Sequence, residues 1–368
     1  MFREIARDAG ARTGTVAFRG AVVTTPAFMP VGTRGAVKGL DARDLLAVGA
    51  EMVLSNTYHL MLRPGAATVA AMGGLAAFQG WPGPTLTDSG GYQIFSLDPR
   101  VTETDAVFRS TYDGSEVRLS PEEAVRCQQL LGADVAMVLD VLIGLPAPNE
   151  AVRAAMEQTL RWSSRARDVH DRTDQALFGI VQGGVDPTLR GRSARATTAL
   201  DFDGYGIGGL SVGESPDERD RAIEAAVAEL PADKLRYVMG LGDAEGVLDA
   251  VARGCDLFDC VWPTRLARHG RVLTPDGDYN LKRAEYAADP RPLHEECSCL
   301  ACGSVSRAYL RHLLMTKEMT VMRLLSMHNL TYTLGLMAET RGAIERGRFS
   351  DHRVSVVERR NGVRREDR

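Results

Sequence analysis

Two stretches of sequence show the pattern from which the fold can be predicted: Leu177-Phe-Gly-Ile-Val-Gln-Gly-Gly184 and Gly204-Tyr-Gly-Ile-Gly-Gly-Leu210. Each is a short apolar run that ends in a polar or glycine-rich turn, which is typical of a strand buried on both faces of a parallel sheet. Six further runs of this kind cover residues 26–32, 51–56, 85–90, 135–140, 236–240 and 256–260. The sequence therefore predicts eight strands.

Helical stretches separate the predicted strands. Ser120, Pro121 and the two glutamates that follow have the order of an N-cap, a first helical residue and an acidic first turn, and Gly132 is a stop. Further amphipathic stretches cover 150–170, 215–230 and 243–253. Eight strand–helix alternations between residue 26 and about residue 270 favour an α/β fold of the (β/α)8 TIM barrel class. The alternative is a doubly wound open sheet, which uses the same alternation with fewer strands.

The remaining segments lie outside the predicted barrel. We expect residues 1–25 to form an N-terminal β hairpin that closes the barrel floor, and residues 26–275 to form the barrel itself. Residues 276–340, which include three cysteines within six positions, are expected to form a zinc-binding subdomain with a long helical stretch over 306–337. Residues 341–368 are a basic C-terminal tail with nine arginines and five acidic residues.

The composition excludes several classes of protein. Hydrophobic residues make up 44% of the 368 residues and charged residues 25%, which is a globular composition. No apolar run reaches the roughly 18 residues of a membrane span, and the N-terminus lacks the apolar core of a signal peptide, so we expect a cytoplasmic protein. The net charge of −4 excludes a wholly basic nucleic-acid coat. All but four of the 44 cationic residues are arginines, which suits phosphate contacts but also results from composition drift between genomes.

Acidic residues stand at the ends of three predicted strands. In a TIM barrel the carboxyl ends of the strands surround the active site, so we expect Asp88, Asp140 and Asp259 to converge over one barrel mouth. Two close carboxylates can divide into a nucleophile and a proton carrier, because like charges and burial separate their pKa values. For each aspartate taken alone, a helix cap or a loop hydrogen bond is an equally good explanation.

Other residues at the predicted strand ends suit a planar ligand. Gln182 offers a donor and an acceptor in one plane, and the neighbouring glycines let backbone N–H groups approach a ligand closely. Tyr92 and Met239 could enclose a ring, although ordinary core packing is the better explanation of Met239 taken alone. After the last strand, Thr264-Arg-Leu-Ala-Arg268 places two arginines three residues apart, which suits successive phosphates or, alternatively, a solvated face.

Three cysteines within six residues predict a metal site. They are Cys297, Cys299 and Cys302. The fourth ligand could be His294, His312 or His328, and we favour His328 because a long helix holds an imidazole rigidly. Three cysteines and one histidine form a closed tetrahedral set for Zn²⁺ with no position for water, so the zinc ion is expected to be structural rather than catalytic.

Taken together, these residues closely resemble the bacterial tRNA-guanine transglycosylases over nearly the whole chain. The motifs that carry the resemblance are Ser55-Asn-Thr-Tyr-His-Leu60, Asp88-Ser-Gly-Gly-Tyr-Gln93, Val181-Gln-Gly-Gly184, Gly208-Gly-Leu-Ser-Val-Gly-Glu214, Phe258-Asp-Cys-Val-Trp-Pro-Thr-Arg265 and the three cysteines with His328. The resemblance implies a zinc-bearing TIM barrel that acts on the wobble guanosine of tRNAs with a GUN anticodon, which are those for Asp, Asn, His and Tyr. It also implies a homodimer.

The resemblance further implies residue roles. Asp259 matches the nucleophile that attacks the anomeric carbon of the ribose, and Asp88 matches the general acid/base. Leu210 and Glu214 match the loop that senses the substituent of the incoming base, 7-aminomethyl-7-deazaguanine, which replaces guanine. The residues that match the base-binding site are Asp88, Ser89, Gly90, Gly91, Tyr92, Asp140, Gln182, Gly209, Leu210 and Met239. Those that match RNA-contacting segments are Gly240, Leu241, Gly242, Asp243, Ala244, Glu245, Gly246, Thr264, Arg265, Leu266, Ala267 and Arg268. Those that match the zinc ligands are Cys297, Cys299, Cys302 and His328.

Three residues depart from the bacterial pattern: Val141, Leu142 and Trp262. Val141 and Leu142 stand where the bacterial text is usually Glu-Cys, and an apolar residue there is found in eukaryotic relatives that accept queuine. Val212 keeps the bacterial form, and we expect its bulk to exclude queuine. Trp262 replaces a commoner smaller residue beside the residue that matches the nucleophile. The alternatives are the same exchange with queuine, a noncatalytic tRNA-binding subunit, a DNA-modifying relative, or a barrel that hydrolyses a small glycoside.

Overall fold

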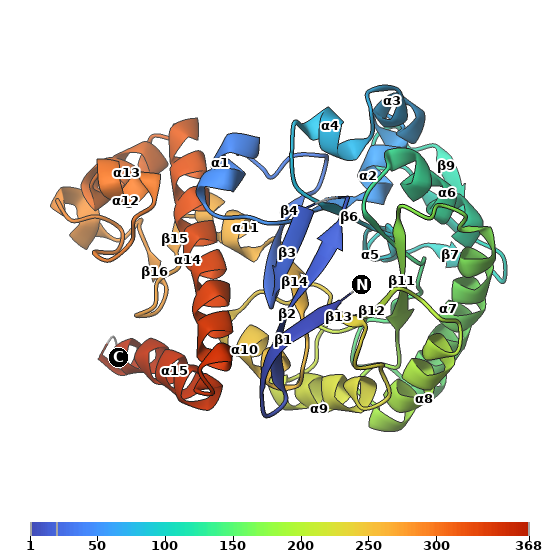
Figure 1. The fold of residues 1–368 in the computed structure, drawn as a ribbon. Coiled ribbons are helices and arrows are strands. Elements are labelled where there is room, and N and C mark those ends of the chain that lie inside the picture. The colour runs from blue at the N-terminus through green and yellow to red at the C-terminus, as the bar shows by residue number, and fades with distance from the viewer. Residues whose placement is uncertain (1, 20, 367–368) are drawn as a thin grey trace.

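The computed structural model describes residues 2–19 and 21–366 (Figure 1). Eight parallel strands pair in sequence order and close into a barrel. They are β4 (Ala27–Gly32), β5 (Val53–Asn56), β6 (Thr85–Asp88), β10 (Val135–Met137), β11 (Ala176–Val181), β12 (Gly204–Ile207), β13 (Leu235–Val238) and β14 (Leu257–Cys260). All eight predicted strands are present, so the TIM barrel is confirmed and the open sheet is excluded.

Helices cover the outside of the barrel and begin where the sequence predicts. Ser120 and Ser215 each accept a hydrogen bond from the third helical N–H and complete a capping box, which starts α6 and α9. The helices between the barrel strands are α1 (Ala42–Ala47), α2 (Thr57–Leu62), α3 (Ala66–Ala71), α4 (Leu75–Gln79), α5 (Gly91–Phe95), α6 (Pro121–Leu131), α7 (Asn149–Val169), α8 (Pro187–Thr198), α9 (Pro216–Val227) and α10 (Ala244–Ala252). After β14 the chain forms α11 (Trp262–Arg268).

The N-terminal segment closes the barrel floor. It forms an antiparallel sheet of β1 (Arg3–Asp8), β2 (Ala11–Phe18) and β3 (Ala21–Thr25), so the predicted hairpin gains a third strand. The fully buried Arg12 forms an ion pair of 2.6 Å with Asp256, just before β14, and donates at 2.8 Å to the carbonyl of Lys234, just before β13. These contacts fix the sheet beneath the amino-terminal ends of the barrel strands.

A second antiparallel sheet was not predicted. It consists of β7 (Arg100–Val101), β8 (Ala106–Arg109) and β9 (Glu116–Leu119) between α5 and α6. Phe108 and Leu119 pack in a buried cluster with Trp162 of α7, whose indole N–H donates at 3.0 Å to the carbonyl of Glu103. This insertion therefore packs against the side of the barrel rather than forming a separate unit.

The C-terminal elements gather on one side of the barrel (Figure 1). They are β15 (Arg271–Val272), β16 (Tyr279–Asn280), the 3-10 helix η1 (Ala284–Ala288), α12 (Leu300–Ser304), α13 (Arg307–Met315), α14 (Met319–Glu345) and α15 (Phe349–Glu366). The helical stretch predicted over 306–337 is two helices, because Lys317 adopts a left-handed conformation between them, and α14 continues to Glu345. Arginines of the basic tail pair with acids elsewhere, as Arg360 does with Asp278 at 2.8 Å. Among the residues described, no helix is long and apolar enough to cross a membrane.

Candidate active site

A pocket of about 550 Å³ opens at the carboxyl ends of the barrel strands. Its walls come from β4, β5, β6, β13 and β14 and from the loops after β6, β10 and β12. The predicted base-binding residues in its lining are Asp88, Ser89, Gly91, Tyr92, Asp140, Gly209, Leu210 and Met239. Gly90 and Gln182 lie behind the lining and act through their neighbours, as described below. The three predicted aspartates therefore meet at one barrel mouth.

Asp259, the predicted nucleophile, lies at the end of β14 with one oxygen firmly held. The Tyr237 hydroxyl donates to Asp259 Oδ1 at 2.6 Å, and the Gly240 N–H donates to the same atom at 2.7 Å. Burial raises the pKa of Asp259, and these two hydrogen bonds oppose that effect. Burial and the Asp259 carboxylate raise the pKa of Tyr237 well above its usual range, so its phenol stays protonated and keeps donating. Because both donors hold Oδ1, Oδ2 is the oxygen left to react.

Asp88, the predicted acid/base, ends β6 in a different environment. Its Oδ1 accepts hydrogen bonds from the backbone N–H of Thr57 at 3.0 Å and of Gly90 at 3.1 Å, and its Oδ2 accepts from the Asn56 amide. Burial and, to a smaller extent, the charge of Asp259 raise the pKa of Asp88 to about 6 against the effect of these bonds. A carboxyl group with this pKa can both give and take a proton near neutral pH.

Asp140 forms the buried end of the pocket. Gln182 Nε2 donates to its Oδ2 at 2.7 Å, and the Ser89 hydroxyl donates to its Oδ1 at 3.4 Å. Burial raises the pKa of Asp140 to about 6, and the bond from Gln182 opposes this. Gln182 therefore orients Asp140 from behind rather than lining the pocket.

The loop after β12 is built around Gly209. This residue has a φ of +64°, and a Cβ there would lie 2.2 Å from Gln182 Oε1, so only glycine fits. Beneath it, the fully buried Arg190 of α8 donates to the carbonyls of Gly208 at 2.7 Å and of Val181 at 2.9 Å. Burial lowers the pKa of Arg190 to about 9, and it remains a cation at neutral pH. Arg190 thus ties the loop after β11 to the loop after β12.

Glu214 organises the next turn of the same loop. Its carboxylate accepts hydrogen bonds from the backbone N–H of Val212 at 3.0 Å and of Ser211. In a trans peptide the carbonyl points opposite to the N–H, so the Leu210 carbonyl is directed away from Glu214. Leu210 and Ser211 line the pocket, whereas Val212 does not.

The two residues that replace the usual bacterial Glu-Cys pair lie in different environments in the structure. Val141 packs beside the buried cluster that contains Trp162 and is not part of the pocket lining, whereas Leu142 is. Tyr92 is 60% exposed at the pocket mouth, and Met239 lies within the wall. Trp262 lines the pocket as well, at the start of α11.

The first segment predicted to contact RNA continues the pocket wall. Residues 240–243 line the pocket, and Asp243 caps α10 by accepting from the Gly246 N–H at 2.7 Å. Ala244 and Gly246 are buried in the first turn of that helix, and Glu245 is partly exposed. Within this segment, residues 240–243 are therefore the ones most accessible to a ligand in the pocket.

The second RNA segment belongs to α11. Arg265 is exposed and lines the pocket, and Leu266 and Arg268 are partly exposed, whereas Thr264 and Ala267 are buried. Burial lowers the pKa of Arg268, and the charge of Arg265 lowers it further. Two cations this close together, on a face beside the pocket, favour a polyanionic ligand.

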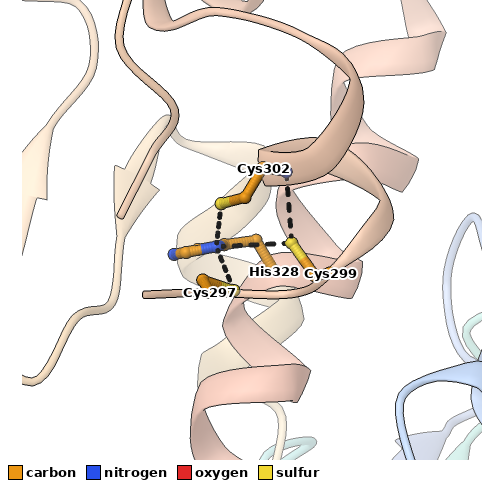
Figure 2. Close-up of side chains that lie close together, drawn as sticks. All are labelled: Cys297, Cys299, Cys302 and His328. Atoms are coloured by element: carbon orange, nitrogen blue, oxygen red, sulfur yellow. Dashed lines mark hydrogen bonds between the residues drawn. The ribbon is translucent and has the colours of Figure 1, made fainter. Parts of the chain in front are cut away.

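The predicted metal ligands lie close together within the C-terminal elements, around α12 and α14 (Figure 2). The Nδ1 atom of His328 lies 3.3–3.6 Å from the sulfur atoms of the three cysteines, and all four donor atoms lie within 4.8 Å of one another. His328 Nε2 lies 3.0 Å from the Leu273 carbonyl, which fixes the ring. His294 instead bonds Asp276 at 3.1 Å, and His312 is exposed. Cys297, Cys299, Cys302 and His328 could hold a metal ion.

Sequence reasoning missed residues that position the predicted catalytic aspartates or the loops of the pocket. Tyr237 lies inside an apolar run and looks like core, and Arg190 lies within a helix without a motif. Asn56 lies within the motif Ser55–Leu60, but nothing in that motif indicates its hydrogen bond to Asp88. Cys260 lacks the spacing of a metal ligand, and its apolar surroundings in the sequence predict a buried thiol. It is instead partly exposed and lines the pocket, and its remaining burial raises the pKa of the thiol to about 12.

Comparison with known proteins is consistent with this site. A model of the queuine tRNA-ribosyltransferase family matches residues 8–362. Proteins named queuine tRNA-ribosyltransferase include one from Stenotrophomonas maltophilia that is 48% identical over 368 residues, with 99% of this chain and 98% of the relative covered. One from Xylella fastidiosa is 49% identical with 96% of each chain covered. One from Thermus thermophilus is 47% identical with 98% of this chain and 94% of the relative covered. The chain therefore belongs to the queuine tRNA-ribosyltransferase family.

Proposed function

We propose that this protein is a cytoplasmic tRNA-guanine transglycosylase of queuosine biosynthesis. It exchanges guanine at the wobble position (34) of tRNAs with a GUN anticodon for 7-aminomethyl-7-deazaguanine. The observation that carries the proposal is the pair of carboxylates at the barrel mouth: Asp259 is bonded by Tyr237 and Gly240 on one oxygen, and Asp88 has a pKa of about 6.

In the first half of the reaction, Asp259 Oδ2 attacks the anomeric carbon of the ribose. The bond between that carbon and the guanine nitrogen breaks, and Asp88 gives its proton to the departing guanine. An ester between Asp259 and the ribose results. In the second half, Asp88 takes a proton from the incoming base, whose nitrogen displaces Asp259. Two displacements at one carbon retain its configuration, as in a retaining glycosidase.

The guanine edge fits the buried end of the pocket. Asp140 presents two carboxylate oxygens to the ring N–H and the amino group of guanine. The Gly209 N–H has no acceptor among the residues that the structure describes and is available to the guanine carbonyl. Tyr92 and Met239 enclose the ring. The same contacts serve 7-deazaguanine bases, which share this edge.

The Leu210 carbonyl supports the aminomethyl base as the incoming substrate. With Glu214 holding the N–H of Ser211, this carbonyl is free to accept from an ammonium group. Such a bond contributes about 1.5–3 kcal/mol, or about tenfold or more in preference over guanine. Leu142 in the pocket lining is the observation that favours queuine instead. Val212, whose bulk was expected to exclude queuine, does not line the pocket, so exclusion of queuine does not follow from its position in this structure.

Two assays test the function. Exchange of labelled guanine into unmodified tRNA is expected, and its absence would identify a noncatalytic tRNA-binding subunit or a glycoside hydrolase. In a competition for the same tRNA, we expect 7-aminomethyl-7-deazaguanine to be incorporated faster than queuine. Faster incorporation of queuine would make the protein a salvage enzyme.

We also propose that Cys297, Cys299, Cys302 and His328 hold one structural Zn²⁺. Zinc at ~2.3 Å from sulfur and ~2.0–2.1 Å from nitrogen in a tetrahedron requires sulfur–nitrogen separations of about 3.6 Å. The separations of 3.3–3.6 Å fit this requirement. The set is closed and lies in the C-terminal subdomain rather than in the pocket lining, so the ion stabilises that subdomain.

The active form is proposed to be a homodimer, in which one subunit orients the tRNA while the other performs the chemistry. Sedimentation of the protein with and without tRNA tests this assembly.

A further inference from the structure

We propose, on the basis of the function above, that Trp262 is a stacking platform for a nucleobase adjacent to the target guanosine. The proposal makes Trp262 a specificity-determining residue for the RNA rather than for the free base. No role is assigned to it by the catalytic mechanism.

The three tryptophans of the chain, all within the described residues, differ in environment. Trp81 and Trp162 are 4% and 1% exposed, and their indole N–H groups donate at 3.0 Å to the carbonyls of Pro84 and Glu103. Trp262 is 46% exposed, and its indole N–H has no acceptor among the described residues. A large aromatic side chain left uncovered and unbonded does not serve the core, and exposed aromatic residues of this kind are typical of binding surfaces.

The backbone presents Trp262 rigidly at the pocket mouth. It is the first residue of α11, three residues after Asp259, and it lines the pocket. The next residue, Pro263, is buried, and its carbonyl accepts a hydrogen bond at 2.9 Å from the buried Asn329 of α14. The position of the Trp262 backbone relative to Asp259 is therefore set by packed elements and not by a flexible loop.

The surroundings of Trp262 match single-stranded RNA. Arg265 lies one helical turn further along α11, is exposed and lines the same pocket. None of the ion pairs among the described residues involves Arg265, so its charge is available to a phosphate. An aromatic face beside a free arginine is the arrangement that binds unstacked bases and their backbone.

The size of the pocket places the neighbouring bases at its rim. A volume of about 550 Å³ is typical of a site for one small molecule. An enzyme that works on a base within RNA must take it out of its stack, and the adjacent bases then lose a stacking partner. Trp262 at the rim is placed to replace that partner.

The first experiment uses tryptophan emission and steady-state kinetics on an anticodon stem-loop RNA. Since Trp262 is the exposed tryptophan, we expect the RNA to quench the emission of the wild type and not that of Trp262→Ala. Stacking of one base corresponds to about 5- to 150-fold in affinity, so Trp262→Ala should raise the KM for RNA by that factor. The KM for guanine should not change, and Trp262→Phe should restore most of the affinity. Leu130→Ala, at a similarly exposed residue on α6, is the matched control and should behave as wild type.

The second experiment removes the base instead of the indole. Stem-loops that lack the base on the 5′ or the 3′ side of the target are assayed with both proteins. One of these RNAs should raise the KM of the wild type as much as the Trp262→Ala substitution raises it with the intact RNA. The same abasic RNA should not raise the KM of Trp262→Ala any further, because the two changes delete one interaction. If the wild type exchanges guanine but neither abasic RNA shows this coupling, the assignment of Trp262 is wrong while the proposed function stands. A change in the sedimentation of Trp262→Ala with an unchanged KM for RNA would assign the indole to a subunit contact and overturn the proposal. A wild type without any guanine exchange would overturn the proposed function itself.

Discussion

Replacing Tyr237 by phenylalanine removes one oxygen atom from the site and should shift the pH dependence of the reaction. The Tyr237 hydroxyl donates to Asp259 at 2.6 Å, which is a short, charge-assisted hydrogen bond. It counteracts the effect of burial, which raises the pKa of Asp259. Without it, the pKa of Asp259 should rise further, although the Gly240 N–H still donates to the same oxygen at 2.7 Å.

The size of the shift follows from the strength of the bond. A hydrogen bond to a charged group contributes about 1.5–3 kcal/mol, and one pKa unit corresponds to about 1.4 kcal/mol. The pKa of Asp259 should therefore rise by about one to two units. Because the nucleophile reacts as a carboxylate, activity is present above its pKa and lost below it. The acid limb of kcat/KM should consequently move to higher pH by the same amount.

The assay is kcat/KM for exchange of labelled guanine into unmodified tRNA, measured across the pH range. Asp88 has a pKa of about 6, and the charge of Asp259 is one of the effects that raise it. Because the two carboxyl groups interact in this way, the apparent pKa values of the pH profile belong to the pair. The matched control is Tyr205→Phe, which removes the same oxygen from an equally buried tyrosine on β12 outside the pocket lining. An acid limb that is the same in Tyr237→Phe as in Tyr205→Phe would refute the assignment of Tyr237 as the residue that keeps Asp259 ionised.

Three further changes test the other roles. Asp259→Asn should abolish the covalent RNA–protein adduct on a denaturing gel while RNA binding persists, and an adduct in this variant would exclude Asp259 as the nucleophile. Asp88→Asn should lose turnover, because an amide cannot shuttle the proton, while slow adduct formation continues; full exchange activity would remove Asp88 from the mechanism. Cys302→Ser should lower the zinc content and the Tm without changing the chemical step, since structural zinc contributes on the order of 10 kcal/mol to folding in small peptides. Full zinc content by metal analysis would show that the ligand set is wrong.

The parts of the structure that sequence reasoning predicted are those with a local physical cause. A strand buried on both faces must be short and apolar, so the eight barrel strands are visible as runs. The caps at Ser120 and Ser215 depend on residues three positions away, and the metal site depends on three cysteines within six residues. The convergence of Asp88 and Asp259 then follows from the barrel, because all parallel strands end at the same mouth.

The inserted sheet of β7, β8 and β9 could not be predicted, because no local pattern in the sequence produces it. Its strands span two to four residues and pair only with one another, and their burial comes from contacts with α7 rather than from an alternating pattern of their own. Short strands of this kind leave too few positions for a period of two to appear. Their existence depends on a surface supplied by residues about fifty positions later in the chain, such as Trp162.

Arg190 shows most clearly why the remaining site residues escape a reading of the sequence. It is one arginine among many, within a helix that is otherwise unremarkable in pattern, yet it is fully buried without a carboxylate partner among the described residues. Its donors are used instead by the carbonyls of Val181, Gly184, Gly208 and Gly209, which end two neighbouring strands. Carbonyls can compensate a buried cation only when several converge on it, so the position of Arg190 and the shapes of both loops depend on one another. The geometry that presents the Gly209 N–H to a base is therefore set by a side chain on the far side of the loop, and contacts of that kind exist only once the barrel has closed.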